Sequence, residues 1–195
     1  MFRILAILAA FAASVASAQI PAKLARTLLP DVSAETIRPV LRQQGLTPET
    51  QTISGRDVLV LRSDRHAIIL QPRVCNPKCT GLLMITLMEG SAPSHLVNDF
   101  NQETPPTMAY TQNGATVLSR YLIADHGITA GTLLVNIGVF DETVRKWLSN
   151  QRASSLSVSL AEQGPAPEID TETRELLSEI RRRPELISGR IQSAY

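Results

Sequence analysis

Aromatic side chains and cysteines are scarce in this chain of 195 residues, and its charges almost cancel. Phe, Trp and Tyr make up 4% of the residues, and 19 basic residues face 18 acidic ones. Nucleic-acid binding needs a basic face that displaces counterions, and single-strand binding adds aromatic platforms for the bases. The composition therefore argues against a nucleic-acid partner, and equally against a polybasic patch for membrane surfaces.

Known catalytic motifs are also lacking. The sequence has no P-loop, dinucleotide-binding fingerprint, His-Glu-x-x-His zinc helix or Gly-x-Ser-x-Gly elbow. The histidines, His66, His95 and His126, are dispersed over separate predicted elements. Asp125 and His126 are adjacent, and adjacent side chains on a strand point to opposite faces. We therefore expect no enzyme activity, no catalytic residue, no metal site and no other cofactor.

The N-terminal segment has the features of a secretory signal peptide. Arg3 supplies a positive charge, an apolar stretch follows, and small residues precede a cleavage site between Ala18 and Gln19. A retained membrane anchor is the competing interpretation, because the uncharged run approaches the length of a span. The run is mostly alanine and is followed by Pro21. We therefore expect removal of residues 1–18, a periplasmic or secreted mature chain, and no stable membrane insertion.

The next part of the chain changes from a helical to an extended pattern. Ser33 can cap a helix that ends at Gly45. Continuous apolar runs at 58–61 and 67–70 flank a polar turn and predict a β-hairpin. Residues 82–88 predict a third strand, which completes an antiparallel meander.

The second half repeats this alternation. Residues 91–104 have helical spacing, and two β-rich runs then flank Asn113 and Gly114, the dipeptide that a two-residue type I′ hairpin turn prefers. Thr129 can cap a long helix, which carries the strongest periodic signal in the chain. Its apolar face is formed by Leu133, Leu134, Ile137, Phe140, Val144, Trp147 and Leu148.

These elements predict the α+β class, in the order α-β-β-β-α-β-β-α. About five strands would form an antiparallel sheet covered by helices on one side, because tight turns between strands do not allow parallel crossovers. The predicted organisation is a signal peptide (1–18), one α+β domain (19–160), and a linker with a C-terminal helical extension (161–195).

The extension contains a charged amphipathic helix. Its apolar residues are Leu176, Leu177 and Ile180. They can pack back onto the domain, or they can form a surface for a partner, because a tethered amphipathic helix is one way in which a chain reaches another protein.

Cys75 and Cys79 are the only cysteines, in the sequence Cys-Asn-Pro-Lys-Cys between two predicted strands. In an oxidising compartment the first expectation is a disulfide, worth about 2 kcal/mol for so small a ring. A redox function is the alternative, supported by the positive charges of Arg73 and Lys78. Redox pairs, however, are usually spaced Cys-x-x-Cys at the start of a helix.

Four segments together resemble the YbjN domain family of bacterial proteins, over roughly residues 33 to 150. They are the Thr-Ile-Ser-Gly run that ends at Gly55, the strand that leads into Cys75-Asn-Pro-Lys-Cys79-Thr-Gly-Leu, the Val97-Asn-Asp-Phe-Asn101 helix, and Arg120-Tyr-Leu-Ile-Ala-Asp-His-Gly127. The chain departs from the usual family pattern at residues 105–108, where Pro-Pro-Thr-Met stands.

The resemblance implies a fold similar to class I type III secretion chaperones. Family members are described as "putative sensory transduction regulators", with no established enzymatic activity and no agreed catalytic residues. We therefore expect a periplasmic protein that binds an unknown protein partner, with a homodimer as a second expectation by analogy of fold. The alternatives are a thiol–disulfide component that uses Cys75 and Cys79, and a binder of a small ligand between sheet and helices.

Overall fold

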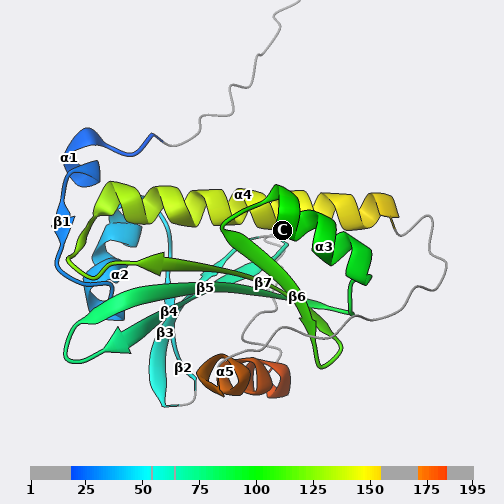
Figure 1. Cartoon of the computed structure of the whole chain (residues 1–195). Helices are drawn as coiled ribbons and strands as arrows, with labels where there is room; N and C mark the ends of the chain where they lie inside the picture. The colour runs from blue at the N-terminus through cyan, green and yellow to red at the C-terminus, as the bar shows by residue number, and fades with distance from the viewer. Residues whose placement is uncertain (1–18, 54, 64, 155–170, 184–195) are drawn as a thin grey trace, which may run out of the picture.

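The computed structural model describes residues 19–53, 55–63, 65–154 and 171–183. The predicted signal peptide, including Ala18 of the cleavage pair, lies outside these residues. The described part contains a six-stranded antiparallel sheet, a two-stranded sheet and five helices (Figure 1). The predicted α+β class and antiparallel sheet are confirmed.

The large sheet has the strand order β2-β3-β4-β5-β7-β6, and each neighbouring pair is antiparallel. The sequence predicted about five strands, and the sixth is the outer strand β2. Only Ile53 of this strand is buried, so β2 lacks the apolar alternation that identifies a strand. The strands are β2 (Glu49–Ile53), β3 (Arg56–Arg62), β4 (Ala67–Cys75), β5 (Cys79–Glu89), β6 (Thr107–Gln112) and β7 (Ala115–Ile123).

The small sheet brings the N-terminal part of the chain to the start of the longest helix. It pairs β1 (Leu28–Leu29) with β8 (Ile128–Thr129), directly before α4. The helices are α1 (Ala22–Ala25), α2 (Ala34–Gln43), α3 (Ser94–Glu103), α4 (Ala130–Ser154) and α5 (Thr171–Arg182). Within the described residues, no helix is both long enough and apolar enough for a membrane span.

Local capping and turn signals act as the sequence predicts. Ser33 Oγ accepts a hydrogen bond from Thr36 N at 3.3 Å and caps α2. Asn113 and Gly114 have φ angles of 53° and 78°, so the β6–β7 hairpin turns in the left-handed region that this dipeptide tolerates. Thr129 Oγ1 accepts from Thr132 N at 3.1 Å at the start of α4.

One face of the large sheet packs against α2 and α4, and we call it the first face. Leu59, Leu70 and Met84 form a cross-strand row on it, since Leu59 is opposite Leu70 and Leu70 is opposite Met84. Alternation along each strand directs these side chains toward the helices, where they are excluded from solvent. The helix residues buried against this face include Ile37, Leu41, Leu133, Ile137, Phe140 and Val144.

The opposite face, the second face, is partly covered by α5 (Figure 1). Leu176 and Leu177 pack there in a cluster with strand residues. The sequence predicted helices on one side only, which holds for α2, α3 and α4 but not for α5. The physical reason is that β3 and β4 are continuous apolar runs, so both of their faces require cover. The buried strand residues of the second face are Ile53, Val58, Val60, Ala67, Ile69, Ile85, Tyr110 and Val117.

The outer edge of β6 is closed by a side chain from α3. Asn101 Nδ2 donates to Ala109 O at 2.9 Å, and Asn101 Oδ1 accepts from Ala109 N at 2.7 Å. Asn101 thereby takes the two backbone hydrogen bonds that a further strand would make at this residue.

Candidate functional site

Four polar side chains meet where the turn between β3 and β4 faces α4. Ser63 and His66 belong to the turn, and Asp141 and Arg145 are four residues apart on one side of the helix. His66 and Asp141 are 75 residues apart in the sequence. The packing of α4 on the first face brings them together.

Hydrogen bonds connect these four side chains in series. His66 Nε2 lies 2.7 Å from Asp141 Oδ1, and His66 Nδ1 lies 3.0 Å from Ser63 Oγ. Arg145 donates to Asp141 Oδ2 at 2.5 Å. Partial burial opposes ionisation of Asp141, but the hydrogen bond from His66 and the charge of Arg145 hold its pKa below the ordinary value. Because an ionised carboxylate only accepts, His66 Nε2 carries the proton in this contact.

The set of serine, histidine and aspartate does not have the arrangement of a hydrolytic triad. Ser63 Oγ also lies 3.1 Å from the carbonyl oxygen of His66, so the hydroxyl closes its own turn. The His66 side chain is only 3% exposed. A nucleophile elbow places its serine on a strand-to-helix turn, whereas Ser63 stands between two hairpin strands. The contacts therefore anchor this turn to α4.

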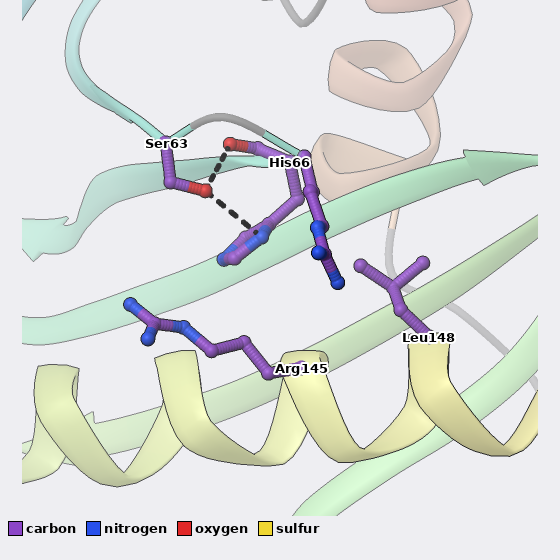
Figure 2. Close-up of a pocket in the computed structure, with 5 residues that line it drawn as sticks. Ser63, His66, Arg145 and Leu148 are labelled. Atoms are coloured by element: carbon purple, nitrogen blue, oxygen red, sulfur yellow. Dashed lines mark hydrogen bonds between the residues drawn. The ribbon is translucent and has the colours of Figure 1, made fainter.

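A pocket of about 370 Å³ opens beside these four residues (Figure 2). In the figure Arg145 and Leu148 project from α4, and Ser63 and His66 face them from the turn. Asp141 does not line this pocket; it lines a neighbouring, more apolar hollow along α4. The pocket is lined by Ser63, Arg65, His66, Arg145 and Leu148.

The remaining two histidines are not part of this cluster. His95 on α3 and His126 before β8 are both exposed, and so is Asp125. Among the described residues, no group of three or more His, Cys, Asp or Glu side chains is arranged to hold a metal ion. Sequence separation hid the His66–Asp141 contact, because no short motif joins a turn to a helix so far along the chain.

Cys75 and Cys79 lie at the tip of the β4–β5 hairpin, directly opposite one another in the register. Their sulfur atoms are at disulfide-bonding distance. Cys79 is buried and Cys75 is exposed, so the two cysteines differ in solvent exposure. A hollow of about 640 Å³ adjoins the pair, and Arg38 and Arg73 contribute to its lining.

The apolar part of the second face extends beyond α5. Met108, Tyr121 and Ile123 point to this face and are 52%, 45% and 65% exposed; we call them the second-face patch. Leu83, opposite Tyr121 on β5, continues the strip and is partly buried. A side chain at Gly81 would collide with the Tyr121 ring, which lies across that strand.

Two of the three residues predicted as a partner surface are buried against this face. Leu176 and Leu177 are 1% and 5% exposed, because they pack on the second face. The side chain of Ile180 lies outside the described residues. α5 therefore occupies part of an apolar face, and the second-face patch is its uncovered continuation.

Residues 33–149 match the model of the YbjN family, described as "Putative bacterial sensory transduction regulator". The chain belongs to the YbjN family. The matched region contains the His66–Asp141 cluster, both cysteines and the second-face patch, and it ends before α5. The family description is that of a regulator and not of an enzyme.

A crystal structure described as "YbjN, a putative transcription regulator from E. coli" is similar to this chain. Its sequence identity is 14% and its TM-score is 0.48, over 62% of this chain and 92% of that chain. No curated protein has a significantly matching sequence.

Proposed function

We propose that this YbjN-family chain is a non-enzymatic accessory protein that acts outside the cytoplasm by binding another protein. The observation that carries the proposal is the second-face patch. Contiguous exposed apolar residues on a sheet face mark interaction sites, whereas scattered ones do not. The family description as a regulator supports a function exerted through binding.

The helix α5 indicates the kind of partner that fits this face. Leu176 and Leu177 face the sheet, while Arg174 and Glu175 are exposed, so α5 is amphipathic. A helix of 12 residues is marginal alone in water and depends on packing. We therefore propose a partner that presents an amphipathic helix, which would extend over the second-face patch and compete with α5.

The proposed compartment rests on the N-terminal residues. Arg3, the apolar stretch and the small residues before Gln19 are those of an export signal. Intact mass of the protein recovered from the periplasm tests this directly. A mature chain that begins at Gln19 supports export, and an uncleaved chain in the cytoplasm contradicts it.

Site-specific photo-cross-linking tests the partner surface in the full chain. A photoreactive amino acid in place of Ile123 reports on the second-face patch, and the same group in place of the exposed Val139 on α4 is the matched control. We expect one specific cross-linked protein from position 123 and none from position 139. A second substitution, Leu176→Asp, should increase that product, because it removes α5 from the competition.

Two other outcomes would contradict the proposal. Cross-links only to abundant bystander proteins, or the same products from positions 123 and 139, would show that the patch is not a specific binding surface. A product of twice the chain mass would assign the patch to homodimerisation instead.

A thiol–disulfide function is the second candidate, and the unequal exposure of the cysteines favours it. Exchange proceeds by attack on an accessible sulfur, and Cys75 is exposed while Cys79 is buried. Alkylation followed by intact mass, before and after reduction, measures whether the thiols cycle. Full biological activity of the Cys75→Ser, Cys79→Ser double variant would eliminate this candidate.

A further inference from the structure

Two arginines are among the described residues that line the pocket in Figure 2. Among the described residues that line it, the charged side chains are those of Arg65, in the β3–β4 turn, and Arg145, on α4. Its volume of about 370 Å³ is within the range of small-ligand sites, roughly 300–1,000 Å³. Two arginines thus meet at one pocket in a chain whose formal charge is only +1.

Asp141 holds Arg145 beside the pocket without entering it. The carboxylate uses Oδ1 for His66 and Oδ2 for Arg145, so both of its oxygens are engaged. A guanidinium has five N–H donors in a planar fork. The Asp141 contact orients the Arg145 side chain and leaves further donors of the fork for a ligand.

The other lining groups complement these two cations. Leu148, one turn beyond Arg145 on α4, brings an apolar side chain, and the Ser63 hydroxyl is engaged with His66. His66 is fixed between Ser63 and Asp141, so the turn that carries Arg65 is anchored to α4. The backbone positions that carry Arg65 and Arg145 are therefore fixed relative to each other before any ligand binds.

We propose that this pocket binds a small phosphate-bearing ligand. Guanidinium groups recognise phosphate through short, charge-assisted hydrogen bonds, and a tetrahedral phosphate can accept from two walls at once. A planar carboxylate matches one guanidinium fork and leaves the other unpaired. Leu148 gives an apolar contact for the organic group of a phosphomonoester. This site is separate from the second face and does not depend on the proposed partner.

Calorimetric titration of the full mature chain with phenyl phosphate, inorganic phosphate and benzoate tests the assignment. We expect saturable binding of phenyl phosphate with a Kd below about 1 mM, and weaker binding of benzoate. The ligand could be a phosphate ester or free phosphate, and comparison with inorganic phosphate distinguishes the two. A lower Kd for phenyl phosphate than for inorganic phosphate indicates an ester, and equal Kd values indicate free phosphate. Binding of neither phosphate, or equally tight binding of benzoate, would overturn the proposal.

Matched variants locate the binding in this pocket. Arg65→Gln should weaken the binding of phenyl phosphate at least tenfold, about 1.4 kcal/mol, and it leaves the contact between Asp141 and Arg145 in place. Arg145→Gln should do the same, with thermal unfolding as a check that the chain still folds. Arg174→Gln on α5 removes an exposed arginine elsewhere and should leave the affinity unchanged. Equal losses in Arg65→Gln and Arg174→Gln would show unspecific attraction and would refute the site.

Discussion

The two faces of the large sheet are built from the same strands but are covered in different ways. The first face is closed by α2 and α4, and its central residues, such as Leu70 and Phe140, are excluded from solvent. Of the described helices, α5 alone packs on the second face; it lies outside the family match and leaves Ile123 exposed. The difference indicates that more apolar side chains are fully buried on the first face, while the second face keeps exposed apolar surface, which we propose as a binding site.

The largest effect is expected from a cavity on the first face. Phe140→Ala should lower the free energy of unfolding by about 3–5 kcal/mol, because it removes a fully buried ring. Its neighbour Val139 is 42% exposed, so Val139→Ala should change stability by less than about 1 kcal/mol. Urea unfolding measures both. Similar losses in the two variants would contradict the assigned core.

A smaller and more local effect is expected on the second face. Leu176→Ala should weaken the docking of α5 on the sheet by about 2 kcal/mol of free energy, which is at the low end for truncation of a buried leucine. Hydrogen exchange should show loss of protection in α5 while the amides of α4 stay protected. If α4 loses protection equally, the two faces unfold as one unit, and the proposed difference in stability between them is wrong.

The link between the turn and α4 should contribute less. Asp141→Asn removes a charge-assisted contact with His66 and Arg145 and should cost about 1–2 kcal/mol near neutral pH. Because folding lowers the pKa of Asp141 from the ordinary 3.8, its contribution is present above that value and is lost as pH falls through the folded-state pKa. Unfolding at several pH values should show wild type and variant converging in acid. The exposed Glu142→Gln is the control, and a difference that persists in acid would disprove the ionic origin.

The smallest effect is expected at the second-face patch. Ile123→Ser replaces a side chain that is 65% exposed and should change the free energy of unfolding by no more than about 0.5 kcal/mol. Such neutrality would mean that the patch is not maintained for stability. A larger loss that depends on protein concentration would show instead that copies of the chain bury the patch.

Local signals predicted most of the fold. Ser33, Thr129 and the Asn113–Gly114 pair specify caps and a turn within a few residues, and the structure contains each of them. The apolar period of α4 predicted its buried face, including Trp147, which packs edge-on against the ring of Phe100 at 4.9 Å.

Long-range packing accounts for what the sequence did not predict. The polar strand β2 is defined by its pairing with β3 and not by its own pattern. His66 and Asp141 meet only because α4 crosses the hairpin. The position of α5 follows from a different property: the continuous apolar runs of β3 and β4 already required cover on both faces.

Asn101 at the outer edge of β6 has a consequence for assembly. It blocks the backbone of Ala109, so the sheet cannot grow beyond β6 at that residue. The opposite edge, β2, has no such contact from a described side chain. If two copies joined along β2, both free ends of the resulting sheet would be blocked β6 strands. The Asn101 contact would then oppose further strand addition at Ala109 on both edges of the pair.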